Sequence, residues 1–415
     1  MPKSAKLGLL GVSVVVLLGL FLGVNWSGVH AAGDEHQEGA YRQINVYGEV
    51  LQHIQSDYVE EPNITKVTHG AMRGLLESLD ADSSYLSPED FKTWKDAKMG
   101  KAQIGVTVSK RFGYATVVSV TAGSPADKAD LSDGDILEAI EGKDTRNLSL
   151  ATIQLMMAGA PGSELKLAVL RPRSAKPEPV TVSRVVMPEA PVQETAYENG
   201  SIEYLKPASV DKDHVSAIEG KIRSAGKAQP AKKILLDLRD VSTGDMAEAI
   251  RLSNLFLDKG TIATLEGQTV AKQTYTAEAS KAVNTNSPVV VLVNRGTYGA
   301  AELVAAALAD NKRAELVGER TFGEGSQQKT FEMPDGGALL LTVAKYASPN
   351  GKKFEDEGVT PGTLVATTDP DVDDSETNDT KVAGAEKNAP KKQASPAAAD
   401  DQLNKGLDLL KAKAA

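Results

Sequence analysis

The chain has 415 residues, of which 41% are hydrophobic and 25% charged, and its formal net charge is −10. This length exceeds what one hydrophobic core usually supports, so two to three globular domains are expected. The negative charge argues against nucleic acid as a partner, because no basic surface stands out that could neutralise phosphates. The absence of cysteine excludes disulfide bonds, thiolate metal sites and a cysteine nucleophile.

The N-terminus has the pattern of an export signal. Lys3 and Lys6 precede an uncharged apolar run, LGLLGVSVVVLLGLFLGV (7–24). This run is long for a cleaved signal and just long enough to span a bilayer. We therefore predict that residues 1–32 are a signal peptide or an uncleaved inner-membrane anchor. The positive residues before the run place the rest of the chain outside the cytoplasm, in the periplasm or cell envelope.

Two patterns follow along the chain. Residues 33–100 have helical periodicity, with the apolar side chains of Val50, Leu51, Ile54 and Tyr58 on one face. Residues 101–188 change to short alternating strands, interrupted by helical stretches within 123–135 and 149–162. These patterns predict a helical N-terminal segment followed by a β-rich domain.

Residues 189–366 alternate between strand and helix patterns. The expected strands are 201–207, 232–240, 261–267, 288–294, 314–320 and the start of 338–351, and the expected helices are 210–225, 245–260 and 300–311. Such β-α-β repetition predicts a mostly parallel sheet covered by helices.

The last segment, residues 367–415, is rich in Asp, Ala, Lys and Pro and lacks periodicity. It cannot bury enough apolar surface to fold, so we predict a disordered tail. A short amphipathic stretch, LNKGLDLLKAKA (403–414), could dock on a partner or the membrane, but we expect it to be a frayed helix.

Three stretches, in this order, resemble the C-terminal processing peptidases, tail-specific serine peptidases that use a Ser/Lys pair and carry an embedded PDZ domain. The first is LDADSSYLSPEDFK (79–92). The second runs through QIGVTV (103–108), GSPADKADLSDGDILEAIEGK (123–143) and LSLATIQLMMAGAPGSELKLAVLR (148–171). The third comprises LLDLRDVSTGDMAEAIRLSNLFLDKG (235–260), the block from VVVLVNRGTYGAAEL to GERTFGEGSQQ (289–328) and LLLTVAKYASPNGK (339–352). The resemblance implies a multidomain α+β chain, with a PDZ domain at 101–188 and an α/β peptidase-like core at 189–366.

The resemblance also implies a peptide-binding groove. PDZ domains add a peptide C-terminus as an extra strand and hold its carboxylate on backbone amides. The loop that would do so here is Gln103, Ile104, Gly105 and Val106. The helix facing the groove would present an apolar pocket made of Leu150, Ile153 and Met157. The alternative is a PDZ domain that only packs against its neighbour.

At the catalytic positions this chain departs from the family pattern. The family's serine stands three residues before a Glu that corresponds to Glu302, which assigns its position to Gly299. The family's lysine lies in a Phe-Gly-Lys-Gly run, which is Phe-Gly-Glu-Gly here and assigns its position to Glu324. An assisting glutamine is matched by Gln328. The loop that supplies an oxyanion amide corresponds to residues 240–244 and includes Thr243 and Gly244.

These substitutions predict a pseudopeptidase. Gly299 has no side chain to attack with, and an anionic Glu324 cannot imitate a neutral lysine. We expect an exported protein that binds protein C-termini or unfolded segments as an adaptor, decoy or regulator, in some cases beside an active homologous peptidase. No cofactor or metal is expected, and membrane contact is expected only through residues 7–24.

Three alternatives remain at this point. A displaced nucleophile could restore peptidase activity, the candidates for this rescue being Thr297, Tyr298, Ser326, Lys329 and Lys345. A carboxylate site could form if Asp240, Asp245, Glu302 and Glu324 came together. The chain could also be a structural envelope protein whose PDZ groove is closed.

Overall fold

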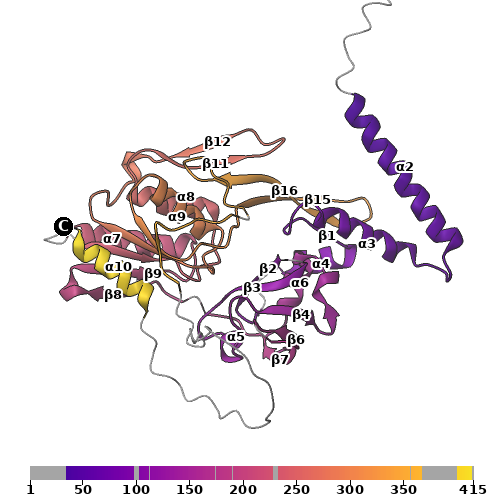
Figure 1. Ribbon diagram of the computed structural model, residues 1–415, viewed down its shortest axis with the longest axis horizontal. Helices are drawn as coiled ribbons and strands as arrows, with labels where there is room; N and C mark the ends of the chain where they lie inside the picture. The colour runs from indigo at the N-terminus through magenta and orange to yellow at the C-terminus, as the bar shows by residue number, and fades with distance from the viewer. Residues whose placement is uncertain are drawn as a thin grey trace, which may run out of the picture. The chain divides into compact units, whose positions relative to one another are not determined.

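The computed structural model describes residues 34–97, 102–111, 113–172, 174–188, 190–227, 232–355, 357–366 and 400–413 (Figure 1). The chain divides into two compact units, Met1–Ala71 and Met72–Ala415. The predicted export segment and the acidic stretch 367–399 lie outside the described residues. Among the helices that are described, none is long and apolar enough to cross a membrane.

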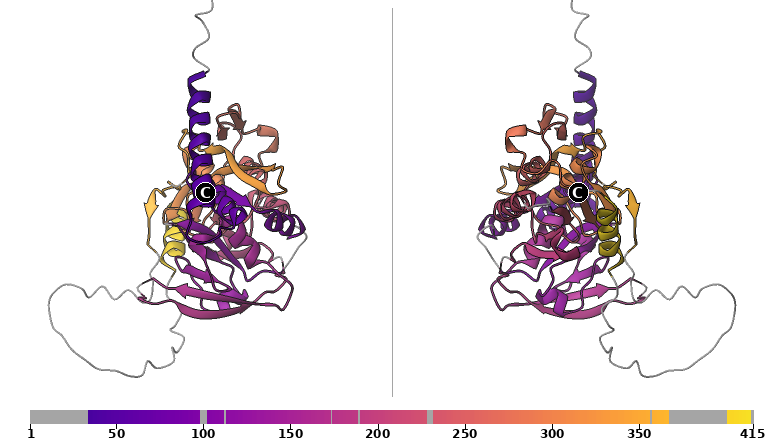
Figure 2. Two further views of the ribbon diagram at one scale, coloured as in Figure 1. Left: turned by 90° about the vertical axis from the view of Figure 1, so that its right-hand side faces the viewer. Right: turned by 90° about the vertical axis from the view of Figure 1, so that its left-hand side faces the viewer.

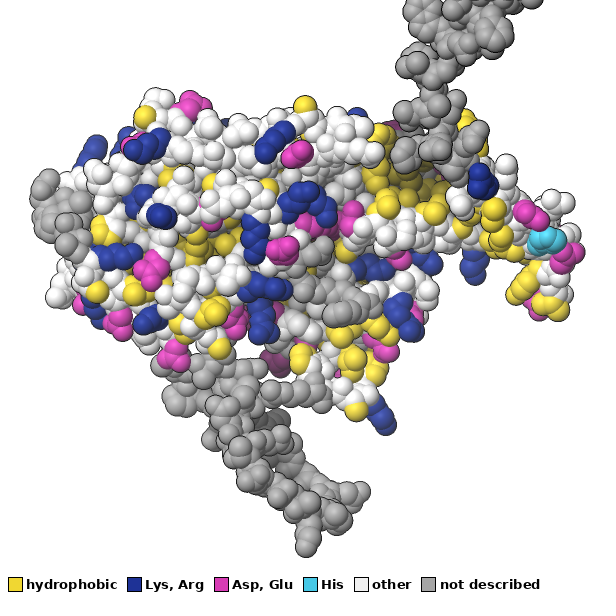
Figure 3. Space-filling model, turned by 45° about the horizontal axis from the view of Figure 1, so that its top comes forward, with side chains coloured by type: hydrophobic (Ala, Val, Ile, Leu, Met, Phe, Trp, Pro, Cys, Tyr) yellow, Lys and Arg dark blue, Asp and Glu magenta, His cyan; other side chains and the backbone are white. Residues whose placement is uncertain are grey.

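The first unit contains helix α2 (Asp34–Asp57) and the beginning of helix α3 (Ile64–Glu77). The predicted helix is present, but its apolar face is not buried within this unit. Val50 and Tyr58 are more than half exposed, as are Tyr41 and Ile44. Figure 3 shows hydrophobic side chains on one face of the molecule, some of them close to an exposed histidine.

In the second unit, a short strand follows helix α3 where the sequence predicted a turn before the next helix. Strand β1 (Ser84–Leu86) pairs antiparallel with strand β16 (Ala338–Ala347), more than 250 residues later. Helix α4 (Pro88–Ala97) follows, with Pro88 at its start and two acidic residues in its first turn. Strand β1 is therefore a structural part of the peptidase-like core.

The PDZ domain is a sheet with the strand order β2-β3-β4-β6-β7, to which β5 adds at β4. Its elements are β2 (Val106–Arg111), β3 (Tyr114–Val120), α5 (Pro125–Lys128), β4 (Ile136–Ile140), β5 (Lys143–Asp144), α6 (Leu150–Met157), β6 (Glu164–Leu170) and β7 (Glu178–Ser183). Alternating side chains of these strands and the inner face of α6 form one hydrophobic cluster. Helix α6 begins at Ser149, whose hydroxyl oxygen accepts from the amide of Thr152.

The core sheet has six strands in the order β17-β14-β13-β10-β9-β8. Its strands are β8 (Gln193–Tyr197), β9 (Ile202–Lys206), β10 (Lys233–Asp237), β13 (Val289–Val293), β14 (Glu315–Gly318) and β17 (Thr363–Leu364). All neighbouring pairs are parallel except β8 with β9. This confirms the predicted mostly parallel sheet. Every residue of β13 is buried, as expected for a strand covered on both faces.

Helices cover both faces of this sheet (Figures 1 and 2). Helices α7 (Lys212–Lys227), α8 (Met246–Phe256) and α9 (Ala300–Asp310) pack in one hydrophobic cluster with the sheet. Helix α10 (Asp401–Ala412) belongs to a separate cluster formed with side chains of β9, β10, β13 and β14. It therefore covers the opposite face.

Not every predicted core strand joined this sheet. β11 (Thr261–Glu266) and β16 form a second, antiparallel sheet with β1, β12 (Gln273–Thr276) and β15 (Ser326–Glu332). Local apolar patterns identify a strand but not its partner, which explains why the sequence placed both in the parallel sheet.

The prediction of a disordered tail through residue 415 is wrong for its last part. Residues 401–412 are helical, and Leu407 and Leu410 are buried against the sheet. Polar contacts fix both ends of α10, because Arg239 binds Asp400 at 2.8 Å and Lys233 donates to the carbonyl oxygen of Leu410 at 2.9 Å. The amphipathic stretch docks on its own chain, because the sheet needs an apolar cover on this face.

Candidate functional site

The turn between β13 and α9 places Gly299 in a strained conformation. Its φ is +58° and its ψ is −111°, which L-residues with side chains rarely adopt. The buried strand leads into the turn, the amide of Tyr298 donates to the carbonyl of Val241 at 3.1 Å, and helix α9 begins at Ala300. A sharp strand-to-helix turn of this kind exposes the residue at its crest.

The position that the resemblance assigns to the base lies beside this crest. A Cβ atom added at Gly299 would lie 3.8 Å from Cγ of Glu324, with no closer heavy atom. The structure thus brings the two sequence-predicted positions together. One of them has no side chain and the other carries a carboxylate.

Glu302 holds the two segments in place. Its buried carboxylate accepts from the amides of Gly299 at 2.9 Å, Gly323 at 2.7 Å and Glu324 at 2.7 Å. It also accepts from the hydroxyl of Thr321. Burial raises the pKa of Glu302 to about 8, although these hydrogen bonds favour its charged form. Glu302 therefore positions the site and is not free to act in it.

A cavity of about 300 Å³ opens at this point. It is lined by side chains from the core, from helix α6 of the PDZ domain and from the N-terminal segment. The lining includes Gly299, Glu324, Gln328, Gly244, Ser242, Ser326, Tyr298, Leu150 and Asp82. Gln328, the predicted assisting residue, donates through Nε2 to the carbonyl of Asp82 at 2.6 Å. Its side chain is thereby tied to the N-terminal segment.

The oxyanion-loop equivalent keeps the backbone shape that its role requires. Gly244 has φ +147°, and a Cβ there would lie 2.6 Å from the carbonyl oxygen of Val210. The carbonyl of Thr243 accepts from the amide of Val210 at 2.9 Å. The amide of Gly244 donates to no partner among the described residues and lines the cavity. The role of this loop as an oxyanion donor stays a prediction.

The same loop carries a contact from the PDZ domain. The hydroxyl of Ser119 donates to Oγ of Ser242 at 2.6 Å, and Thr107 shares a hydrogen bond with it at 2.7 Å. Ser242 therefore connects strands β2 and β3 of the PDZ domain to the oxyanion loop.

The carboxylates that gather here differ from the set that was considered from the sequence. Asp240 lies outside the group, because its Oδ1 accepts from the side-chain amide of Asn294 at 2.8 Å. Asp245 precedes helix α8 without a side-chain capping bond. Oxygen atoms of Asp82, Glu324 and Glu355 instead lie within 4.8 Å of one another. Among the described residues, these three carboxylates are the groups that could together hold a cation. No other feature of these described residues points to a bound cation.

Burial of this cluster changes how its members bind protons. Burial, followed by the neighbouring carboxylates of Glu324 and Glu355, raises the pKa of Asp82 to about 9. Burial also raises the pKa of Tyr298, whose hydroxyl is hydrogen-bonded to Glu324, well above its ordinary value. Near neutral pH, Asp82 therefore favours its protonated form.

The raised pKa of Asp82 predicts a pH-dependent stability. Between about pH 4 and 9 the native state holds this proton, whereas the unfolded chain has released it. The stabilising contribution of Asp82 to the free energy of unfolding is therefore complete below the unfolded pKa and is lost as the pH rises to about 9. Asp80, Glu324 and Glu355 face the same group and oppose its ionisation. Asp82→Asn should flatten this decline in urea unfolding at pH 5, 7 and 9.

The matched control is Asp258→Asn, because Asp258 is an exposed carboxylate at the end of helix α8. It should leave the pH profile of the free energy of unfolding unchanged. Equal profiles for the natural chain and Asp82→Asn would contradict the assignment of a neutral Asp82.

The predicted carboxylate loop of the PDZ domain has the required backbone. Gly105 has φ +87°, and a Cβ there would lie 2.3 Å from Cβ of Ser124, so glycine is needed. The carbonyls of Ile104 and Gly105 accept from Ala126 and Thr121, whereas their amides donate to no partner among the described residues. Two amides are thus available for a carboxylate. Gln103 is held by a two-way backbone pairing with Val185, and Val106 begins strand β2.

The apolar residues predicted for the groove are less accessible. Ile153 is fully buried, and Leu150 and Met157 are 4% and 6% exposed. All three belong to the hydrophobic core of the PDZ domain. Leu150 also lines the cavity beside Gly299, and the peptide-binding role of the three residues stays a prediction.

The rescue candidates separate clearly. Thr297 is fully buried and donates through its hydroxyl to the carbonyl of Leu238 at 2.9 Å, away from the cavity. Lys329 lies over the ring of Phe331, and Lys345 faces Glu355 at 3.8 Å. Ser326 and Tyr298 both line the cavity and contact Glu324. The hydroxyl of Ser326 donates to Oε1 of Glu324 at 2.5 Å.

Comparison with known proteins agrees with this architecture. Residues 201–365 match peptidase family S41, and residues 116–171 match the PDZ domain. A carboxyl-terminal-processing protease of a Picosynechococcus species is 33% identical over 71% of this chain and 72% of that protein. The chain belongs to the carboxyl-terminal processing protease family. This confirms the predicted family and its PDZ domain.

Two further similarities bear on the extent of the match. A carboxy-terminal-processing protease of Bartonella bacilliformis is 29% identical over 80% of this chain and 76% of its own length. The solved structure of the photosystem II D1 C-terminal processing protease is similar with a TM-score of 0.66 at 23% identity, covering 77% of this chain and 92% of that one. This structural match supports the fold described above for this chain. The chain spans between 61% and 76% of the length of the first four curated relatives.

Sequence reasoning missed Asp82 and Glu355 as neighbours of Glu324. Asp82 lay within the N-terminal stretch that carried the family resemblance, but no spacing rule links it to a residue about 240 positions away. Ser326 was considered only as a rescue nucleophile. Its hydrogen bond to Glu324, two residues before it, depends on the turn into strand β15.

Proposed function

We propose that this protein is an exported polypeptide-binding member of the family that does not use the Ser/Lys mechanism. One observation carries the proposal. The positions facing each other across the cavity are Gly299, which has no nucleophile, and Glu324, whose carboxylate cannot act as a neutral amine. The chain would hold protein C-termini or unfolded segments in the cell envelope as an adaptor or regulator.

Two observations support this proposal: backbone amides are available in the PDZ loop, and the Ser and Lys of the family chemistry are absent from positions 299 and 324. The amides of Ile104 and Gly105 are available for a terminal carboxylate. Ser119 and Thr107, on the strands that follow, reach Ser242 in the core. A peptide added along β2 would thus lie close to the former catalytic loop. An active relative in the same compartment would be a natural partner for such a binder.

Peptide binding is tested by calorimetry with a peptide that ends in an apolar residue and a free carboxylate. The full chain is expected to bind it with micromolar affinity, and the same peptide with an amidated C-terminus should bind at least about tenfold more weakly, because a charge-assisted hydrogen bond is lost. The amidated peptide is a control that leaves the protein unchanged. Equal affinity for the two peptides would overturn carboxylate recognition.

A second candidate function is favoured by the Ser326 geometry. The Ser326 hydroxyl donates to Glu324, and the protonated Asp82 lies 3.4 Å from the same hydroxyl. In this reading Glu324 accepts the Ser326 proton as the hydroxyl oxygen attacks a peptide carbonyl, and returns it to the leaving amine. The amide of Gly244 would take the oxyanion.

Ser326→Ala separates the two candidates. If the natural chain cleaves an unstructured polypeptide and Ser326→Ala does not, hydrolysis through Ser326 is the function. If neither cleaves it, binding without hydrolysis stands. Cleavage retained in Ser326→Ala would exclude the Ser326 route and point to a nucleophile elsewhere in the cavity.

A further inference from the structure

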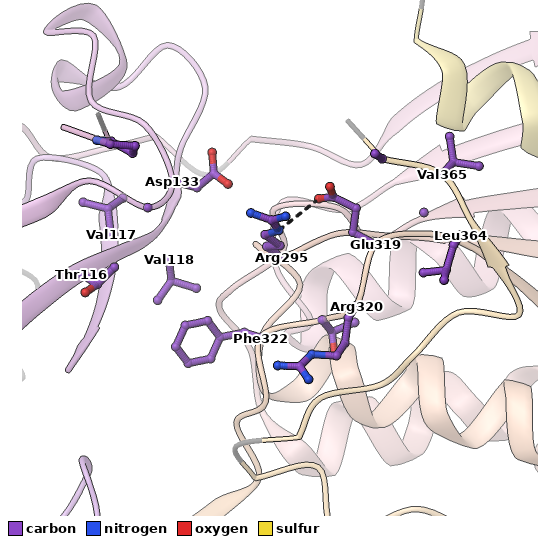
Figure 4. Close-up of a pocket in the computed structure, with 15 residues that line it drawn as sticks. Thr116, Val117, Val118, Asp133, Arg295, Glu319, Arg320, Phe322, Leu364 and Val365 are labelled. Carbon is purple, nitrogen blue, oxygen red and sulfur yellow. Dashed lines mark ion pairs between the residues drawn. The ribbon is translucent and has the colours of Figure 1, made fainter. Parts of the chain in front are cut away.

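A second and larger cavity lies away from Gly299, with a volume of about 800 Å³ (Figure 4). One wall comes from strand β3 of the PDZ domain and from Asp133. The other comes from the segments after β13 and β14, at Arg295 and at residues 318–322, and from strand β17. The carboxyl ends of parallel strands are a usual place for ligands in open α/β sheets.

Two guanidinium groups point into the opening between these walls (Figure 4). The side chain of Arg295 is 75% exposed, and its Nε lies 3.8 Å from a carboxylate oxygen of Glu319, which is longer than a hydrogen bond. Arg320 is exposed and forms no hydrogen bond or ion pair with any described residue. Asp133 and Glu319 are the acidic groups of the lining. Arg320 is thus available to bind an anionic group, and Arg295 forms only a weak ion pair with Glu319.

The rest of the lining suits a polypeptide more than a small anion. Val118, Phe322 and Leu364 supply apolar surface, and Leu364 is 70% exposed. Strand β17 is the last in the order of its sheet, so its outer edge pairs with no strand in the described part of the chain. An extended backbone could add along this edge.

The two cavities share a wall. Phe322 lines the larger cavity, Tyr298 lines the smaller one, and their ring centroids are 5.2 Å apart. Glu324, two residues after Phe322, is hydrogen-bonded to Tyr298. A ligand against Phe322 would therefore touch the element that borders the Gly299 site.

We infer that the larger cavity binds a carboxylate-bearing polypeptide segment, with its acidic side chains on Arg320 and Arg295 and its apolar side chains against Val118 and Phe322. This inference rests on the proposed polypeptide binding and adds a second subsite to it. We assign this place to a segment of this same chain, and another polypeptide is the alternative that the test below separates. The stretch 367–380, TTDPDVDDSETNDT, follows directly on Ala366 in the cavity wall and carries six acidic residues and no basic one.

The test uses a fluorescein-labelled peptide with the sequence of residues 367–380 and its counterpart in which each acidic residue is an amide. Anisotropy with the full chain should show the acidic peptide binding at least about tenfold more tightly than the amide peptide. Arg320→Gln and Arg295→Gln should each weaken binding by about three- to fivefold, and added salt should weaken it further. The matched control is Arg223→Gln, an exposed arginine on helix α7, which should bind as the natural chain does.

Unchanged binding in Arg295→Gln/Arg320→Gln, or equal binding of the two peptides, would overturn the site. A full chain whose six acidic residues in 369–379 are replaced by amides distinguishes the sources. Tighter probe binding by that variant identifies the chain's own segment as the occupant, and unchanged binding identifies another polypeptide. The apolar C-terminal peptide serves as a parallel probe of the PDZ loop, so loss of its binding alone would count against the proposed function and not against this cavity.

Discussion

The double variant Gly299→Ser/Glu324→Lys is expected to cleave an unstructured polypeptide that the natural chain leaves intact. The cavity has room for the serine, because nothing lies closer than 3.8 Å to a Cβ at position 299. The positive φ costs a side chain roughly 1–2 kcal/mol, which a folded scaffold can tolerate. The amide of Gly244 remains available for the oxyanion.

The size of the gain depends on the carboxylates around position 324. A general base contributes about 10²–10⁴-fold when it is neutral and well placed. Here Asp82 and Glu355 would pair with the new lysine and keep it charged. We therefore expect a gain of about tenfold over Gly299→Ser alone, and a further rise when Asp82→Asn is added.

The measurement is the initial rate of substrate loss on gels or by released fluorescence. Gly299→Ala/Glu324→Lys is the matched control, since it has the base without the nucleophile. Equal cleavage by this control and the double variant would show that position 299 is not the nucleophile position. Cleavage by the natural chain would contradict the interpretation that this protein has no hydrolase activity. Ser326 would then be the first residue to replace.

Leu410→Ala is expected to lower the free energy of unfolding by about 2–5 kcal/mol, the usual cost of a buried Leu→Ala change. Leu410 is fully buried between helix α10 and the core sheet, in a cluster with Leu235, Val290 and Leu292. Helix α10 is amphipathic, so the loss removes packing and leaves a cavity at the centre of its interface. Urea unfolding followed by circular dichroism provides the measurement.

Lys405→Ala is the control, because Lys405 is an exposed residue of the same helix. Its effect should stay within about 0.5 kcal/mol. If both variants unfold at the same urea concentration, helix α10 does not contribute to the stability of the core. The prediction of a tail that does not pack on the core would then be correct.

Much of the candidate site could be predicted from neighbouring residues. The run at 288–294 predicted a buried strand, the apolar pattern of 300–311 predicted a helix, and the turn between them placed Gly299 at its crest. The family resemblance, through the Phe-Gly-Glu-Gly run, implied that Glu324 stands at the position of the base. These are local patterns, and hydrophobic periodicity and turn chemistry act over a few residues.

The surroundings of Glu324 could not be predicted in this way. Its neighbours Asp82 and Glu355 come from segments that are far apart in the chain, and the proton held by Asp82 depends on their burial together. The apolar residues of helix α6 were read correctly as apolar, but periodicity does not say whether such a face lines a groove or a core. In the structure they pack into the core of the PDZ domain.

The sequence by itself determined the family with its PDZ domain, the mostly parallel sheet and the residues at the positions that the resemblance assigns to the catalytic pair, because each depends on local patterns or on motif spacing. Only the tertiary structure decided that β1 and β16 pair, that helix α10 covers the second face of the sheet, and that carboxylates surround position 324. These features arise from contacts between segments that are far apart in the chain, in some cases by more than 240 residues. Such contacts are selected by the burial of complementary surfaces, which no local pattern records.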